Sequence, residues 1–171
     1  MRIILLATAM IGLAAVTLSP AWSVEPDLVY QRIHAQVADH DNRISLRLWP
    51  DDTIEMRFPA YTRQAGHYRW QAGPDERQQL ENVFSELCQL PRDQLAAAIH
   101  SPREGTLTEV ADADLVRFVG RGLNCEAFEL VVEAPDALSR ARPDVAELAN
   151  LKRLESDLLD WMREYVRKVG R

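Results

Sequence analysis

The stretch ISLRLWPDDTIEMRF, residues 44–58, decides the fold class because its two halves alternate apolar and polar side chains. Residues 44–48 and residues 54–58 each place an apolar side chain at every even position. Successive side chains of a strand point to opposite faces, so this period of two predicts two strands with one apolar face each. Pro50, Asp51 and Asp52 between them are typical turn residues. The stretch therefore predicts an antiparallel β-hairpin with one buried face.

Similar alternation recurs on both sides of the hairpin. Residues 67–71 place Tyr68 and Trp70 on one face of a further strand. In the second half of the chain, residues 106–110, 114–119 and 126–134 are strand candidates separated by turn-forming residues. These segments predict that the hairpin belongs to a larger antiparallel sheet.

The segment before the hairpin, residues 29–37, also alternates. Its apolar side chains lie at odd positions, beginning with Val29 and Ile33, whereas Arg32 and His34 lie at even positions. The pattern predicts a half-buried strand whose even positions face solvent.

Helical spacing of apolar residues appears in the middle and at the end of the chain. Residues 74–88 begin with a proline and two acids, as helices often do, and residues 93–100 form a second short candidate. A long amphipathic helix opens at residues 142–144. Its apolar stripe consists of Val145, Leu148, Leu151, Leu154, Leu158, Trp161, Met162, Tyr165 and Val169.

This order of elements predicts an α+β fold. We expect an antiparallel sheet of about six to seven short strands, packed on one face by the mid-chain helix and the long C-terminal helix. Residues 24–171 form a single predicted domain, which is long enough to bury its own core.

Residues 1–23 have the layout of a secretory signal peptide. Arg2 precedes an apolar run from Ile3 to Val16, and the small residues Ala21 and Ser23 are suited to cleavage after Ser23. The run is shorter than the roughly 20 residues that a membrane span needs, although an uncleaved N-terminal anchor is the alternative. We therefore expect a periplasmic or secreted protein that is not stably inserted in a membrane after cleavage.

Net charge and cysteine content give two further expectations. The formal net charge is −6, and acidic chains are poor general binders of nucleic acid, so we expect no nucleic-acid partner. Cys88 and Cys125 are the two cysteines, and an oxidising compartment favours a disulfide between them. Two buried free thiols are the alternative. Cys125 has the parity of the polar face of its strand, so a disulfide requires the chain to bend just before Cys125.

The segment MRFPAYTRQAGHYRW, residues 56–70, carries the candidate binding residues Tyr61, Arg63, His67 and Arg69. Alternation in strands explains part of this mixture of basic and aromatic side chains. Tyr61 and Arg63, however, lie in a loop between two strands, where recognition residues are common, and both residue types are frequent at interface centres.

Chemical motifs give little support to catalysis. The sequence contains none of the signatures of serine hydrolases, zinc proteases, P-loops or dinucleotide-binding folds, and we assign no catalytic residue and no cofactor. His34, His40 and His67 are candidate metal ligands, although their spacing fits no known ligand pattern. The stronger interpretation is that His34 lies on the polar face of its strand and that His40 belongs to an ordinary turn.

The succession of hairpin, glycine-ended loop, strand and helix resembles uncharacterised bacterial secreted domains of α+β fold. Gly66, His67 and Tyr68 match a G-x-Y strand of those domains, and Asp112, Ala113 and Asp114 match a D-x-D segment. Asp51 and Asp52 replace the usual glycine of the hairpin turn. The resemblance implies a fold and an exported location, and it implies no activity or site residue.

Three functions remain open from the sequence. The first is a non-enzymatic binding module that recognises a protein or an envelope component through residues 60–70 and the adjoining sheet edge; an inhibitor of a secreted hydrolase is one form of it. The second is an enzyme with an unrecognised, metal-dependent site. The third is a structural subunit of an envelope complex that docks through its C-terminal helix, which exposed Trp161 and Tyr165 would favour.

Overall fold

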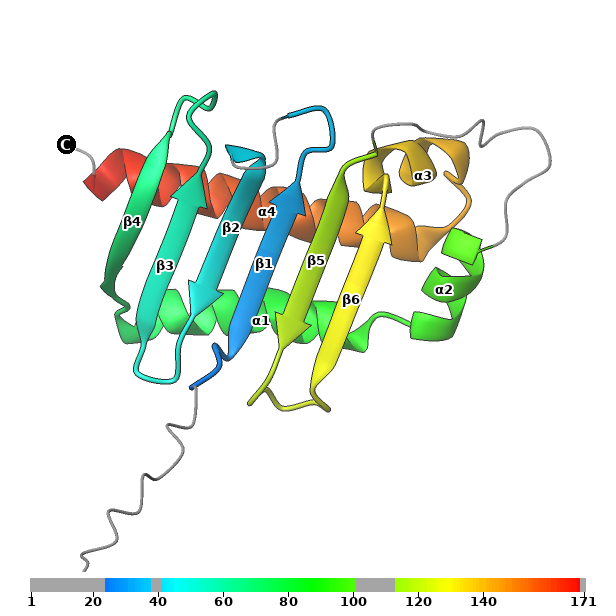
Figure 1. The fold of residues 1–171 in the computed structure, drawn as a ribbon. Helices are drawn as coiled ribbons and strands as arrows, with labels where there is room; N and C mark the ends of the chain where they lie inside the picture. Colours follow the sequence, from blue (N-terminus) through cyan, green and yellow to red (C-terminus); the bar gives the residue numbers. More distant parts are fainter. Residues whose placement is uncertain (1–23, 38–40, 101–112, 170–171) are drawn as a thin grey trace, which may run out of the picture.

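The computed structural model describes residues 24–37, 41–100 and 113–169, and in these residues six strands form one antiparallel sheet (Figure 1). The strands are β1 (Leu28–Ile33), β2 (Arg43–Leu48), β3 (Thr53–Phe58), β4 (Gly66–Gln71), β5 (Leu115–Gly120) and β6 (Phe128–Glu133). The helices are α1 (Pro74–Gln89), α2 (Arg92–His100), α3 (Pro135–Ala141) and α4 (Ala146–Val169). The predicted α+β class and the predicted hairpin are both confirmed.

The order of strands across the sheet is β4-β3-β2-β1-β5-β6, and all neighbouring strands are antiparallel. The first four strands form a meander, and β5 joins the free edge of β1 after the two helices α1 and α2. Tyr30 of β1 therefore lies opposite Leu46 on one side and Phe118 on the other. This arrangement places β1, the first strand of the chain, in the middle of the sheet and leaves β4 and β6 as its edges.

One face of the sheet packs on α1 and α4, which both lie behind it in Figure 1. The core between sheet and helices contains Phe84 of α1 and Phe118 of β5, which are fully buried with ring centroids 6.0 Å apart. The apolar side chains on one face of α4 are buried against the sheet and its neighbouring helices, which confirms the predicted packing of the long helix. They are Leu148, Leu151, Leu154, Leu158, Leu159, Met162 and Val166.

The predicted orientation of the first strand is wrong. Leu28 and Tyr30 face the helices and are essentially inaccessible to solvent, and Arg32 follows them on the same face, so the even positions point inward. Val29 and Gln31, which point to the opposite face, are also buried. Because side chains on both faces of β1 are buried, its composition does not show which face meets the helices.

The second half of the chain differs from the prediction in two elements. Residues 135–141, for which the sequence patterns predict no element, form the short helix α3, which begins at Pro135 as its first residue. The long helix begins at Ala146, shortly after the predicted start at residues 142–144. The strand candidate at residues 106–110, Asp112 of the D-x-D segment and the signal segment 1–23 lie outside the described residues.

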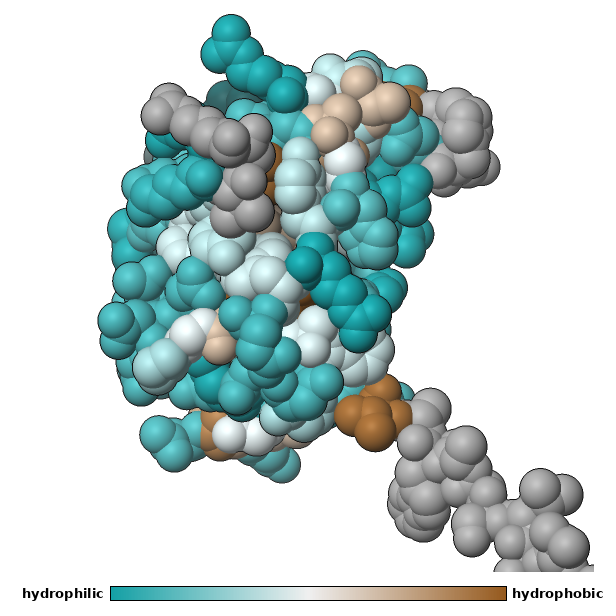
Figure 2. Space-filling model, turned by 90° about the vertical axis from the view of Figure 1, so that its left-hand side faces the viewer, coloured by the Kyte–Doolittle hydropathy of each residue, from teal (hydrophilic) through white to brown (hydrophobic). Residues whose placement is uncertain are grey.

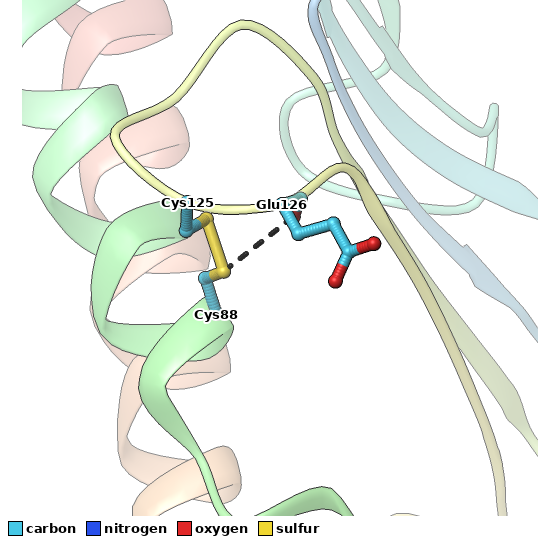
Figure 3. Close-up of a disulfide and its surroundings, with 3 residues drawn as sticks. All are labelled: Cys88, Cys125 and Glu126. Carbon is cyan, nitrogen blue, oxygen red and sulfur yellow. Dashed lines mark hydrogen bonds between the residues drawn. A yellow bond between two sulfur atoms is a disulfide. The ribbon is translucent and has the colours of Figure 1, made fainter.

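Cys88 and Cys125 form a disulfide, as predicted, with Cα atoms 6.6 Å apart (Figure 3). Cys88 lies in the last turn of α1, and Cys125 lies in the loop between β5 and β6, where the chain has not yet entered the strand. The Cys88 sulfur is 3.7 Å from the carbonyl oxygen of Glu126. The disulfide ties the end of α1 to the edge hairpin β5–β6 and closes a loop of 37 residues.

Candidate binding face

The face of the sheet turned away from α1 and α4 is covered by no described helix (Figure 1). Odd positions of β2 and β3 and of β4 point to this side, because the even positions fill the core. Arg43, Arg47, Arg57 and Arg69 are therefore neighbours on three adjacent strands, and His67 lies directly opposite Arg57. We call this surface, formed by the odd positions of β2, β3 and β4, the open face.

Two acids of the described residues, Glu55 and Asp41, form ion pairs with arginines of the open face. Glu55 is the one acidic residue among the open-face positions of β2, β3 and β4, and it is shared between Arg47 at 3.9 Å and Arg69 at 3.6 Å. Asp41, which precedes β2, lies 3.5 Å from Arg57. The open face thus carries an excess of positive charge on a chain whose formal net charge is −6.

Two hollows adjoin on the open face. The first, of about 360 Å³, is basic and is lined by Arg43, Ser45, Arg47, Glu55, Met56, Arg57 and His67. The second, of about 660 Å³, is more apolar and is lined by Val24, Trp49, Pro50, Asp51, Glu55 and Arg69. Glu55 belongs to both hollows, so they meet at its side chain. The pair can receive a ligand that combines acidic and apolar groups.

The structure separates the four predicted binding residues into two places. His67 and Arg69 lie on the open face. Tyr61 lies in the loop before β4, about half exposed, and its ring meets the ring of His34 edge-on at 5.9 Å. Burial, together with the charges of Asp114 and Asp41, raises the pKa of the Tyr61 hydroxyl. Arg63 is exposed in the same loop.

The three predicted metal ligands are not brought together in the described residues. His34, at the end of β1, places its Nδ1 atom 3.1 Å from a carboxylate oxygen of Asp114. His67 lies on the open face beside Arg57, and His40 falls outside the described residues. Within residues 24–37, 41–100 and 113–169, no three histidine, cysteine or acidic side chains are grouped so that they could hold a metal ion.

Sequence reasoning missed a second charged cluster, centred on Arg32. Its guanidinium donates hydrogen bonds to Asp114 at 2.8 Å, to Asp136 at 2.8 Å and to Glu155 at 3.0 Å. The hydroxyl of Tyr30 donates to the same Glu155 oxygen at 2.8 Å. One arginine therefore connects the central strand to the start of β5, to α3 and to the middle of α4.

The electrostatics of the Arg32 cluster are those of a satisfied structural network. Burial opposes the charge of Arg32, but the hydrogen bonds that Arg32 donates to Asp136 and Asp114, together with the charge of Glu155, outweigh it, and the pKa of the guanidinium is raised. The hydrogen bond from Arg32 lowers the pKa of the Asp136 carboxyl. Burial and the neighbouring Glu155 raise the pKa of Tyr30. All three acids already accept hydrogen bonds from Arg32, so we interpret this cluster as structural.

The aromatic side chains of α4 are engaged within the molecule. Tyr165 stacks on Trp70 of β4 with ring centroids 4.0 Å apart, and Trp161 stacks on Tyr165 at 5.7 Å. The indole nitrogen of Trp161 also donates a hydrogen bond to Gln79 of α1. Both residues are half-buried, so the exposed aromatic surface that would favour docking through the C-terminal helix is not present at these two positions.

Strand parity is the sequence signal that points to the open face. It places Arg57 and Arg69 on the solvated side of their strands. Arg43 and Arg47 are not among the predicted binding residues, yet they have the same odd parity as the hairpin's polar face, and that parity could have identified them. What the sequence does not show is that β2, β3 and β4 are adjacent and that no described helix covers this side.

No protein-family model matches the chain, and no curated protein matches it in sequence. The resemblance to secreted bacterial domains stays a prediction, and the function has to be argued from the chain's own residues. None of the described helices is long and apolar enough to span a membrane.

Proposed function

We propose that this protein is an exported, non-enzymatic binding module whose open face recognises an acidic segment of a partner protein. The observation that carries the proposal is the excess of arginine on the open face. The open-face positions of β2, β3 and β4 carry one acid, Glu55, and four arginines, which are Arg43, Arg47, Arg57 and Arg69. The chain as a whole is acidic.

The placement of these arginines favours recognition over folding. Ion pairs on an exposed surface contribute little to stability, about 0–1 kcal/mol. Arg47 and Arg69 approach Glu55 only at 3.9 and 3.6 Å, which is longer than a good charge-assisted hydrogen bond. Arginine forms paired hydrogen bonds with carboxylates and is enriched in interfaces, so such a surface is suited to an acidic partner.

The apolar hollow beside Trp49 and Pro50 adds to this proposal. A purely electrostatic surface would bind any polyanion, including nucleic acid, with little selectivity. An apolar hollow next to the basic one favours a peptide segment that carries acidic and apolar side chains together. The disulfide is compatible with the exported location that residues 1–23 predict, because disulfides persist in oxidising compartments.

The test is affinity capture from the organism's exported proteins with three forms of the chain. The first is the unchanged protein, and the second is Arg43→Glu with Arg47→Glu on the open face. The matched control is Arg163→Glu with Arg167→Glu, which makes the same change in charge on exposed positions of α4.

We expect one acidic protein to be retained by the unchanged and control forms and lost from the open-face form. Its affinity, measured with the purified proteins, should fall as salt rises, because exposed charges are screened. Equal capture by all three forms would refute the proposal. Equally tight binding of a single-stranded oligonucleotide would assign the open face to nucleic acid instead.

A further inference from the structure

Strand β4 is an edge strand whose outer backbone is accessible in the described structure. It pairs with β3 along its whole length through six residue pairs without a bulge, and no described strand pairs with its other side. It contains no proline, and Gly66 lies only at its start. Natural sheets commonly block their edges with prolines, bulges or charged side chains, and of these β4 carries only the exposed charge of Arg69. The outer N–H and C=O groups of β4 are therefore a template for a further strand.

The side chains of β4 give this edge two different faces. His67 and Arg69 are exposed on the open face. Tyr68 and Trp70 are half-buried on the helix side, where Tyr68 meets Phe58 edge-on at 6.5 Å. Figure 2, which views the molecule from this edge, shows a surface dominated by hydrophilic side chains. The edge is thus basic on one side and aromatic on the other.

We propose that the partner binds by adding an extended segment to β4, with acidic side chains beside His67 and Arg69 and apolar side chains beside Tyr68 and Trp70. This inference rests on the proposed function and specifies how one segment of the acidic partner is held at the edge, while the rest of the partner covers Arg43 and Arg47 on the open face. In such strand addition, main-chain hydrogen bonds supply affinity and alternate side chains supply specificity. Alternation along the added strand would match both faces of the edge at once.

The charges also select against the most obvious competitor, a second β4 strand. Two copies joined through β4 would place His67 and Arg69 near their own counterparts, and like charges on adjacent strands are destabilising. The opposite edge differs, because β6 alternates Glu129 and Glu133 with apolar residues. A second copy that offered β6 would satisfy the same chemistry, so the test has to separate self-association from binding of a partner.

The spacing between strands predicts which arginine lies close enough to the added segment to affect its binding. Neighbouring strands lie about 4.8 Å apart, so a segment beside β4 is one spacing from Arg69 and about 14 Å from Arg43 on β2. Arg69→Glu should therefore weaken binding of a strand-forming acidic peptide at least tenfold. Arg43→Glu, which makes the same change in charge two strands away, should weaken it less than threefold.

The probe is a capped nine-residue peptide that alternates glutamate with valine, phenylalanine and isoleucine. In an extended peptide, every second amide points to the same edge. Two further peptides carry N-methyl groups on alternate amides, one on the amides of the glutamates and the other on the amides of the apolar residues. They have nearly the same composition and the same charge, but each blocks hydrogen bonding along a different edge.

Binding is measured by titration, and amide hydrogen exchange is measured with and without the unmethylated peptide. We expect one methylated peptide to lose at least tenfold in affinity while the other binds like its parent. We also expect the outward amides of β4 to become protected. Equal binding of both methylated peptides would overturn strand addition, as would a larger effect of Arg43→Glu than of Arg69→Glu.

The failure of this inference can be told apart from failure of the proposed function. If no peptide binds but affinity capture still depends on Arg43 and Arg47, recognition by the open face stands and strand addition at β4 is wrong. If capture is also independent of these arginines, both proposals are wrong. A mass that rises with concentration in the absence of peptide, and falls back on Glu133→Lys, would assign the β4 edge to a second copy and overturn the partner.

Discussion

Tyr30 and Glu155 are separated by 125 residues, and they are joined in the core by a hydrogen bond of 2.8 Å. Glu155 is only 4% exposed, although it lies on a helix that is otherwise divided between apolar and solvated faces. A buried carboxylate requires both a donor and a countercharge, and Tyr30 and Arg32 supply them from the central strand. This relationship fixes the position of α4 on the sheet.

Replacing Arg32 with methionine should therefore destabilise the fold strongly. The methionine side chain fills a similar volume, but it leaves Glu155 buried without its countercharge, which costs about 3–5 kcal/mol. Urea denaturation followed by far-ultraviolet circular dichroism measures the change. Arg47→Met on the open face is the control and should leave the denaturation midpoint nearly unchanged. Similar midpoints for the two variants would show that the Arg32 cluster contributes nothing to stability.

A second prediction concerns acid pH and Asp136. The hydrogen bond from Arg32 lowers the pKa of this carboxyl in the folded protein below its ordinary value of about 3.9. A group whose pKa is lowered by folding stabilises the folded state above its unfolded pKa, and this contribution is lost as pH falls through the folded pKa.

Asp136→Asn should accordingly be less stable than the unchanged protein at neutral pH, and the difference should shrink as the pH falls below the ordinary carboxyl pKa and through the lowered pKa of the folded state. Denaturation midpoints of both proteins between pH 7 and pH 2 test this point. Glu133→Gln, at an exposed carboxylate on the far edge strand, is the control. A difference between Asp136→Asn and the unchanged protein that stays constant with pH would contradict the assigned ion pair.

How far the sequence predicts this structure depends on the kind of strand. The hairpin at residues 44–58 has one buried and one solvated face, so its alternation identifies both strands and their inward side. In β1 the inward residues Tyr30 and Arg32 have polar ends, and Val29 on the other face is also buried. The alternation in β1 therefore predicts the opposite orientation of this strand. The inward face is decided by Glu155 of α4 and Asp136 of α3, which bind the polar ends of Tyr30 and Arg32 and are distant in the sequence.

The same reasoning explains the candidate site. The predicted residues His67 and Arg69 lie on the open face because strand parity places them there. Tyr61 and Arg63 belong to a loop, and no period relates a loop residue to the strands around it. Recognition of Arg43 and Arg47 as part of one surface requires the pairing of β2 with β3 and of β3 with β4, and that register comes from the structure.

A third prediction concerns the disulfide between Cys88 and Cys125. Closing a loop of this length restricts the unfolded chain and stabilises the fold by about 2–4 kcal/mol. Changing both cysteines to serine should lower stability by that amount while the circular dichroism spectrum stays the same. A reductant should lower the stability of the unchanged protein to that of the variant and should leave the variant itself unaffected.

The last prediction concerns Gly120 and Phe128, which lie opposite each other on β5 and β6. A Cβ atom added at Gly120 would collide with the ring of Phe128, a side chain that is 5% exposed and packed in the core. Gly120→Ala should therefore cost about 1–3 kcal/mol, because a well-packed core cannot easily accept an extra carbon.

A double-mutant cycle separates this collision from any general intolerance of alanine in β5. Leucine at position 128 removes the ring atoms nearest to Gly120, so Gly120→Ala should cost at least about 1 kcal/mol less in the Phe128→Leu background. Urea denaturation of the four proteins gives the coupling energy directly. A coupling near zero would show that the glycine is required by the backbone of β5, and that the close approach of Phe128 does not select it.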